Sequence, residues 1–411
     1  MDDGGTDGTL IDDASRVARA VAARGGRALV VGGFVRDQLL GIASKDLDLE
    51  VFGVPEDDLR ALLATLGRVE PVGQAFPVYK LGAIDVALPR RESKTGRGHK
   101  GFEVRGDPSM SFDEAARRRD FTINAIGWDP LSGEYLDPFD GRGDLARRVL
   151  RVVDPATFAD DSLRVLRALQ FAARFDLTVD EDTRAICRAI LLDDLPAERI
   201  WGEMEKLLLQ APRPSIGFAL ARDIGVVERI LPEMVPLYTC PQDPEWHPEG
   251  DVWTHTLMVI DEARARNADL DRPRLAAIML GAVCHDLGKP ETTIHVDGRV
   301  KSPGHEAAGV PHATRRSTGS TSTRWTASTC GRRCWGSWPS TSGRARSTRR
   351  RTRSPTARSE DSRRRWTWSC WRGSRAPTVM GARGRSTAAR WTGSSSGHAR
   401  SASSTARPRR S

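Results

Sequence analysis

Acidic residues alternate with aliphatic ones in one short segment, Lys45-Asp46-Leu47-Asp48-Leu49-Glu50-Val51. Successive side chains of a strand point to opposite faces, so Asp46, Asp48 and Glu50 would share one face. Two carboxylates about 7 Å apart along a strand can both bind Mg²⁺, a cation that prefers oxygen ligands. Two such ions stabilise the entering and leaving oxygens of a phosphoryl or nucleotidyl transfer.

A glycine pair precedes this segment, in Val30-Val31-Gly32-Gly33-Phe34-Val35-Arg36-Asp37. Gly32 and Gly33 allow the backbone to approach a triphosphate closely, and the amides that open the following helix favour an anion. Asp85, flanked by Ile84 and Val86, can bring a third carboxylate from a neighbouring strand. An Asp-x-Asp pair by itself is also typical of a solvated strand face. Its place after a glycine turn and a short helix favours a catalytic role.

The hydrophobic periodicity predicts an α+β head with a small mixed sheet, followed by an all-helical body. In the head it indicates helices over 11–24, 34–40 and 55–66, strands over 27–31, 46–52 and 79–88, and a mobile loop over 91–101. Strand signals vanish after about residue 145, and helices are predicted over 160–175, 181–192, 197–209, 215–224, 252–266 and 273–286. The corresponding domains are the head (1–148), a helical neck (149–230), a further helical domain (231–311) and a tail (312–411).

The net charge of +9 is unevenly divided along the 411 residues. Residues 312–411 contain 24 Arg, no Lys, one Asp and one Glu, a net charge of +22, which leaves −13 for residues 1–311. The basic character therefore belongs to the last hundred residues. It does not indicate nucleic-acid affinity of the whole chain.

This last segment also differs in composition, with seven of the eleven Trp but no Leu, Ile, Phe, Tyr, Asn or Gln. It cannot supply an aliphatic core, so we expect it not to fold. It could be an arginine-rich RNA-binding tail or a disordered extension. The favoured hypothesis is out-of-frame translation of a GC-rich gene, with the switch near residues 309–312. A single clean reading frame there would contradict it.

The rest of the composition narrows the class of protein. No apolar run approaches the roughly 18 residues of a membrane span, and the acidic N-terminus does not fit a signal peptide. Six cysteines without paired spacing indicate a reducing compartment. We expect a cytoplasmic protein without a membrane partner; the oligomeric state stays open.

The motifs together resemble a known family. Gly32-Gly33-x-Val35-Arg36-Asp37 with Asp46-x-Asp48 resembles the signature of the bacterial and eukaryotic class of tRNA CCA-adding enzymes and the related poly(A) polymerases, members of the DNA polymerase β nucleotidyltransferase superfamily. Four further segments resemble later motifs of that family in the same order. They are Arg117-Arg118-Arg119-Asp120-Phe121-Thr122-Ile123-Asn124-Ala125, Asp137-Pro138-Phe139-Asp140-Gly141, Asp160-Asp161-Ser162-Leu163-Arg164 and Glu198-Arg199-Ile200-Trp201-Gly202-Glu203.

The resemblance implies roles for individual residues. Asp46 and Asp48 would bind the catalytic Mg²⁺ ions, with Asp85 as a third catalytic carboxylate. The nucleotide would be bound by residues in or next to three of these motifs, and Asp120 would accept a hydrogen bond from the ribose 2′-hydroxyl. Arg118 and Arg119 suit phosphate, although a solvated basic helix end is the alternative. The implied nucleotide-binding residues are Gly32, Gly33, Arg36, Arg119, Asp120, Asn124, Asp161, Arg164 and Arg167.

Asp161 and Arg164 are three residues apart and would share a helix face. A carboxylate and a guanidinium present both acceptors and donors, and in the resembled family such a pair reads the edge of the incoming base. Arg167 lies on the same broad face and could hold RNA phosphate. A simple Asp161–Arg164 ion pair within the helix is the structural alternative.

A second candidate site contains His255, His285 and Asp286, within Trp253-Thr254-His255-Thr256 and Cys284-His285-Asp286-Leu287-Gly288-Lys289. Their order and separation resemble the HD family of metal-dependent phosphohydrolases, which implies a second divalent metal. The further Asp of an HD site has no counterpart in the unusual tail, and His305 is a substitute. A structural buried histidine is the alternative.

The sequence therefore predicts a template-independent nucleotidyltransferase that adds or repairs the CCA 3′ end of tRNA with CTP and ATP. The alternatives are a poly(A) polymerase, an enzyme that adds only CC or only A, an HD-type phosphohydrolase with a vestigial head, and an inactive fragment.

Overall fold

A computed structural model describes residues 4–72, 77–94 and 102–314. The predicted unfolded tail, apart from its first three residues, and residues 95–101 of the predicted mobile loop lie outside these ranges. The division into domains at residues 148, 230 and 311 stays a prediction. Among the described helices, none is both long and apolar enough to cross a membrane.

A mixed seven-stranded sheet forms the centre of the described part of the head, in the order β3-β4-β5-β2-β1-β8-β9. β2 and β5 are parallel, and the other neighbours are antiparallel. The sheet strands are β1 (Arg27–Val31), β2 (Leu47–Phe52), β3 (Val69–Val72), β4 (Val78–Leu81), β5 (Ile84–Ala87), β8 (Gly127–Trp128) and β9 (Tyr135–Leu136). This architecture confirms the predicted α+β head with a mixed sheet.

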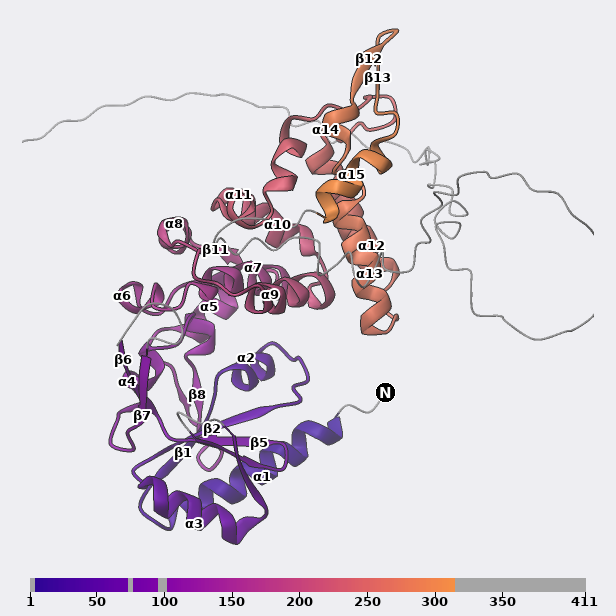
Figure 1. The fold of residues 1–411 in the computed structure, drawn as a ribbon. Coiled ribbons are helices and arrows are strands. Elements are labelled where there is room, and N and C mark those ends of the chain that lie inside the picture. Colours follow the sequence, from indigo (N-terminus) through magenta and orange to yellow (C-terminus); the bar gives the residue numbers. More distant parts are fainter. Residues whose placement is uncertain (1–3, 73–76, 95–101, 315–411) are drawn as a thin grey trace, which may run out of the picture. The chain divides into compact units, whose positions relative to one another are not determined.

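The alternation within β2 decides which of its faces is covered. Leu47, Leu49 and Val51 are buried in a core with α1 (Gly4–Ala22) and α3 (Glu56–Leu66), which lie on the same side of the sheet (Figure 1). The side chains that alternate with them therefore point to the opposite face. That face carries Asp48 and Glu50.

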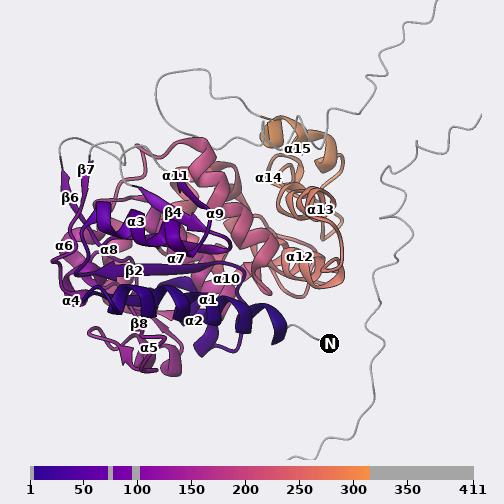
Figure 2. The same ribbon diagram turned by 90° about the horizontal axis from the view of Figure 1, so that it is seen from below.

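β1 is apolar on both faces because both are covered. Ala28 and Val30 face the main core, whereas Leu29 and Val31 pack in a second cluster with Phe112 of α4 (Phe112–Arg117). α2 (Gly33–Leu39) follows β1 directly and contacts β1 and β2 (Figure 2).

Several sequence-based boundaries are wrong. The strand predicted over 79–88 is a hairpin of β4 and β5, because Gly82 turns the chain with φ 65°. The predicted loop at 91–101 begins as strand β6 (Arg90–Lys94), which pairs with β7 (Phe102–Gly106). The first helix begins at Gly4, and the short strands β3, β8 and β9 were not predicted.

Strands also occur after residue 145, contrary to prediction. β10 (Val149–Leu150) pairs with β11 (Thr178–Val179), and β12 (Ile294–Val296) pairs with β13 (Arg299–Lys301). Runs of two or three residues are too short to give a period-2 signal.

The remainder of the described chain is helical, as predicted. All six helices predicted there are present; α12 has the predicted ends, and the ends of the other five are shifted. The six helices are α7 (Leu163–Phe175), α8 (Glu181–Ala189), α9 (Ala197–Gln210), α10 (Pro214–Asp223), α12 (Val252–Arg266) and α13 (Arg272–Cys284). The shorter elements are η1 (Thr122–Asn124), α5 (Gly141–Arg147), α6 (Pro155–Phe158), α11 (Val226–Ile230), η2 (Pro232–Thr239), α14 (Lys289–Thr292) and α15 (His305–Thr314).

Aromatic packing joins the sheet domain to the first of these helices. Phe121 is fully buried and makes edge-to-face contacts with Phe158 and Phe171, with ring centroids 5.5 and 5.8 Å apart. Such pairs contribute about 0.5–1.5 kcal/mol beyond their buried area. This contact fixes α7 beside the residues that follow α4.

Candidate active site and a histidine cluster

A cavity of about 490 Å³ opens between the acidic face of the sheet and the starts of α7 and α9. Five acidic and seven arginine side chains line it, so it is polar and carries both signs of charge. They are Asp48, Glu50, Asp85, Asp120, Asp161, Arg36, Arg90, Arg118, Arg119, Arg164, Arg167 and Arg199. Gly32, Gly33 and Asn124 also line it, so all nine predicted nucleotide-binding residues meet here.

The predicted metal-binding acids come from neighbouring strands. Asp48 of β2 is opposite Asp85 of β5 in the parallel register. Asp46 is exposed and directly precedes β2, so it is not part of the strand as predicted. Asp85 forms an ion pair with Lys80 at 2.9 Å. These three acids are absent from the sets of described residues whose ligand atoms lie within 4.8 Å of one another.

The surroundings of Asp48 nonetheless suit a cation. Desolvation raises the pKa of Asp48, Arg119 lowers it, and the charges of Asp85, Glu50 and Asp46 raise it further. A group of like charges around a partly desolvated carboxylate lowers its free energy by binding a divalent ion. Mg²⁺ is commonly held by one or two carboxylates, with substrate phosphates and water completing its shell. The donor set therefore fits such an ion.

Gly32 lies between Asp48 and Arg119. Its φ of 72° is unfavourable for other residues, and a Cβ there would lie 2.9 Å from Nη1 of Arg119. Arg119 also forms an ion pair with Glu50 at 3.1 Å. The glycine thus allows a guanidinium to lie beside the turn.

Arg36 is buried and has partners on every side. It forms an ion pair with Asp37 at 2.6 Å, donates to Oδ1 of Asn124 at 2.6 Å, and stacks over Phe171 and Phe175 of α7. Burial lowers the pKa of Arg36, whereas Asp37 raises it. In this structure the guanidinium mainly holds α2 against α7, a role that sequence reasoning did not predict.

Asp120 was expected to contact the ribose. Its carboxylate accepts hydrogen bonds from the backbone N–H of Phe121, from Asn124 and from Arg167, at 2.8, 2.9 and 2.6 Å. Burial alone would raise the pKa of Asp120, but Arg167 and these hydrogen bonds hold it below its usual value. Three of about four acceptor positions are therefore used within the protein.

Asp161 and Arg164 do not form the simple intrahelical ion pair that was the structural alternative to base recognition. Asp161 lies before α7 and pairs instead with Arg199 of α9, while Arg164 donates to the backbone carbonyls of Thr157 and Arg118 at 3.0 and 2.8 Å. Both Asp161 and Arg164 still line the cavity. The sequence analysis included Arg199 only as part of a motif. No local sequence pattern indicates that it pairs with Asp161, which is 38 residues away.

The second candidate site is a cluster around the buried carboxylate of Asp286. Nε2 of His285, His305 and His255 lies 3.1, 3.4 and 3.9 Å from its oxygens. His255 belongs to α12 and His305 begins α15, whereas His285 and Asp286 follow the end of α13 rather than lying within it. The structure therefore brings together the three predicted residues and His305.

Atoms in this cluster have the features of metal ligands. Nε2 of His285 and Oδ2 of Asp286 are buried atoms whose partners are ion pairs only, without a hydrogen bond of acceptable geometry. Burial alone would raise the pKa of Asp286, but His285 and Lys289 hold it well below its usual range. Lys289 supplies a cation 2.8 Å from Oδ2. The set fits a divalent ion bound by imidazole and carboxylate.

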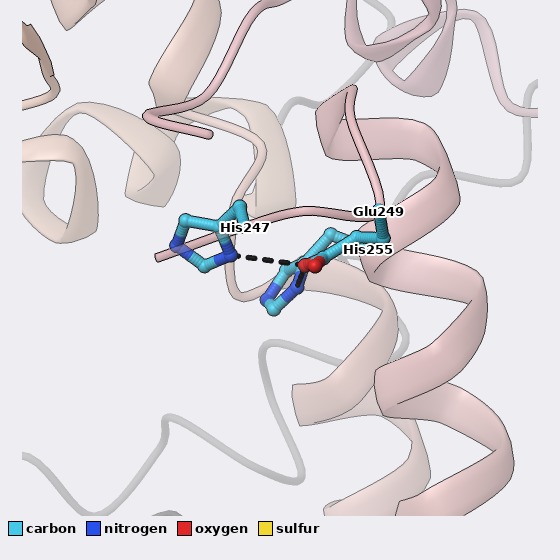
Figure 3. Close-up of side chains that lie close together, drawn as sticks. All are labelled: His247, Glu249 and His255. Atoms are coloured by element: carbon cyan, nitrogen blue, oxygen red, sulfur yellow. Dashed lines mark hydrogen bonds and ion pairs between the residues drawn. The ribbon is translucent and has the colours of Figure 1, made fainter. Parts of the chain in front are cut away.

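Two further residues of this cluster, His247 and Glu249, were not singled out from the sequence. Oε1 of Glu249 lies 3.0 and 2.7 Å from Nδ1 of His247 and His255 (Figure 3). Burial would raise the pKa of Glu249, but hydrogen bonds from its own backbone, His247 and His255 lower it. Burial lowers the pKa of His255. The only sequence signal was their proximity to His255.

Known proteins match this chain in the same regions. Residues 28–151 match the poly A polymerase head domain, and residues 176–237 match the probable RNA and SrmB-binding site of polymerase A. The multifunctional CCA protein of Aromatoleum aromaticum is 41% identical over 295 residues, 70% of this chain and 68% of that protein. The one from Laribacter hongkongensis is 39% identical over 286 residues, 68% of this chain and 67% of that protein.

A solved tRNA-processing enzyme is also similar, with 27% identity, a TM-score of 0.45 and coverage of 67% of this chain and 74% of that one. The matched head domain and the acidic and basic cavity define an RNA nucleotidyltransferase. Such enzymes work with divalent metal ions. At 41% identity over two thirds of a relative, this chain belongs to the family of multifunctional CCA proteins.

Proposed function

We propose that this chain adds or repairs the CCA end of tRNA, taking CTP and ATP as substrates and releasing pyrophosphate. Membership of the family supports this reaction. The structural observation that carries it is the pairing of Asp48 with Asp85 on adjacent strands, at a cavity lined by arginines. A cavity of this kind matches a triphosphate with a bound cation.

In this proposal Asp46 and Asp48, with Asp85 as the third carboxylate, are the residues that would hold Mg²⁺. When bound, Mg²⁺ stabilises charge on the attacking and leaving oxygens. The tRNA 3′-hydroxyl attacks the α-phosphorus, the bond to the β-phosphate oxygen breaks, and pyrophosphate leaves. Gly32 and Gly33 keep the turn free of side chains, and Arg119 lies beside it as a donor to phosphate.

The remaining cavity residues serve nucleotide choice and alignment. Asp161 presents its carboxylate to the cavity with Arg199 behind it, and Arg164 retains donors on the same side. Asp120, Asn124 and Arg36 form the buried support, and Arg167 connects that support to α7. Asp120 retains one acceptor position for the ribose 2′-hydroxyl.

Incubation with tRNA that lacks CCA, Mg²⁺, and CTP or ATP separately tests the reaction. We expect CTP alone to extend the tRNA by two residues and ATP to add one residue only after them. Long adenylate runs would instead identify a poly(A) polymerase. Addition of only CC or only A would identify a partial enzyme, and no incorporation would contradict the proposal.

A second activity is supported by the convergence of three histidine Nε2 atoms on Asp286. We propose a divalent-metal site formed by His255, His285, Asp286 and His305, of the kind that hydrolyses phosphate esters. A divalent ion held by these residues would supply an activated water and a Lewis acid for phosphate ester hydrolysis.

Hydrolysis of bis-p-nitrophenyl phosphate with Mn²⁺ or Co²⁺ tests this second activity. Asp286→Asn should abolish hydrolysis and leave CCA addition intact, whereas Asp48→Asn should do the reverse. Hydrolysis that survives Asp286→Asn would contradict the assignment. Because tRNA is the substrate of the main activity, we place the protein in the cytoplasm.

A further inference from the structure

Glu249 holds two imidazoles through a single oxygen. Its Oε1 lies 2.7 Å from Nδ1 of His255 and 3.0 Å from Nδ1 of His247, and the two rings meet edge to face with centroids 4.7 Å apart (Figure 3). Glu249 and both histidine side chains are partly buried, with 14%, 29% and 21% of the Glu249, His247 and His255 side chains exposed. Solvent therefore has limited access to these hydrogen bonds.

The chemistry of the acceptor determines which nitrogen of His255 carries hydrogen. An ionised carboxylate only accepts hydrogen bonds, so Nδ1 of His255 must be the donor. In a neutral imidazole the other nitrogen, Nε2, is then an unprotonated acceptor. It is this atom that lies on the side of Asp286, 3.9 Å from Oδ2.

The other two histidines of the cluster follow the same pattern with a different acceptor. Nδ1 of His285 lies 2.8 Å from the carbonyl oxygen of Ala282, and Nδ1 of His305 lies 2.8 Å from that of Ser302. Both partners are neutral backbone groups three residues earlier in the chain. Of these three histidines in the described chain, only His255 has a carboxylate as the partner of its Nδ1.

The segment that carries Glu249 is fixed to the start of α12. Asp251 caps the helix by accepting from the N–H of Thr254 at 2.7 Å, and the N–H of Val252 donates to the carbonyl of Cys240 at 3.0 Å. Gln242 also donates to the carbonyl of Asp251. The carboxylate and the ring of His255 are therefore held in one rigid unit.

We infer that Glu249 is the positioning residue of the histidine cluster: it fixes the tautomer and ring orientation of His255 so that Nε2 is presented to a divalent cation. This inference rests on the proposed second metal site. Carboxylates that accept from the remote nitrogen of a ligand histidine raise its basicity, and their loss typically weakens metal binding by about 10- to 100-fold. His247 shares Oε1 and steadies the carboxylate.

Titration of the full-length protein with Co²⁺, followed by visible absorption and chelator competition, tests the inference. The band that His285→Asn abolishes identifies the cluster. Glu249→Gln should weaken Co²⁺ binding at this band by about 10-fold or more, and Glu249→Ala by more still, because glutamine keeps one acceptor. Glu245→Gln is the matched control, since this exposed residue of the same loop pairs with Arg299. CCA addition should be unchanged in both Glu249 variants and in Glu245→Gln.

A second readout needs no metal. Long-range ¹H–¹⁵N spectra of histidine-labelled protein should show His255 protonated at Nδ1 in the wild type and a shift towards the Nε2-protonated form in Glu249→Ala. Nε2 protonation in the wild type would overturn the inference.

The outcomes separate the inference from the function on which it rests. Equal Co²⁺ affinity of wild type and Glu249→Gln would refute the role of Glu249 and leave the metal site intact. Absence of the band from the wild type would refute both. Two bound ions, one of them removed by His247→Asn, would make Glu249 a ligand of a separate site with His247 and His255 and overturn the positioning role.

Discussion

Asp161 and Arg199 form a bidentate ion pair between the residues before α7 and the first turn of α9. Nη1 of Arg199 lies 3.2 Å from Oδ1 of Asp161, and Nη2 lies 2.9 Å from Oδ2. Parallel hydrogen bonds of this kind fix the plane of a carboxylate as well as its position. The edge that Asp161 presents to the cavity is therefore set by a residue of a different helix.

Substitution of Arg199 should alter nucleotide choice. Arg199→Met removes two charge-assisted hydrogen bonds, and a rotated Asp161 should lower kcat/KM for CTP and ATP by about 10- to 100-fold and reduce discrimination against UTP. Single-nucleotide incorporation assays measure both effects. Arg184→Met, which breaks ion pairs at the periphery with Glu181 and Asp223, is the control. Unchanged discrimination in Arg199→Met would show that Asp161 does not need this partner.

The acids beside Gly32 should be indispensable for nucleotide incorporation. Asp46→Ala and Asp48→Ala each remove a proposed Mg²⁺ ligand, and we expect incorporation to fall by roughly a thousandfold or more. Asp57→Ala on the exposed first turn of α3 is the control. Melting curves verify that each variant folds. Retained activity in either aspartate variant would refute the metal assignment.

Gly288 should be required for the histidine cluster to assemble. A Cβ at this position would lie 2.1 Å from the carbonyl oxygen of His305 and 2.4 Å from the N–H of Gly309, both backbone atoms. Gly288→Ala should therefore push α15 away, cost about 1–3 kcal/mol, and abolish Co²⁺ binding at the cluster. Hydrogen exchange of α14 and α15 measures the loss of protection.

A neighbouring glycine provides the control for this substitution. Gly281 lies within α13 and a Cβ there has nothing within 4 Å. Gly281→Ala should raise stability by about 0.5–1 kcal/mol, since alanine favours the helix. Equal behaviour of the two alanine variants would contradict the packing argument.

Asp120 should make the stability of the folded protein sensitive to acid. Its pKa is lowered in the folded protein, so its ionised form stabilises the fold above its unfolded pKa of about 3.9 and this stabilisation is lost as the pH falls below that value. Asp120→Asn should lower the Tm at pH 7, because Arg167 loses its partner. The difference in Tm between wild type and variant should shrink from pH 5 towards pH 3. A Tm difference that grows as the pH falls would contradict the predicted direction of this pH dependence.

The local part of the candidate site could be predicted from the sequence. β1, Gly32, α2 and β2 form one continuous stretch, and its alternation and glycine placement are encoded by near neighbours. The same holds for His285 and Asp286, which are adjacent in the chain. The order of the motifs also sufficed to predict the reaction class, and hydrophobic periodicity sufficed to predict the α+β head.

Tertiary structure decided which of these side chains act together. Asp161 pairs with Arg199 rather than Arg164, Arg36 is enclosed by the aromatic rings of α7, and Glu249 orients His255. Each relationship depends on how helices pack, and packing depends on the volumes and shapes of side chains distant in the chain, which no local period records. The sequence alone therefore determined the chemistry available to this protein, and the packing of α7, α9 and α12 determined the partner of each charged group.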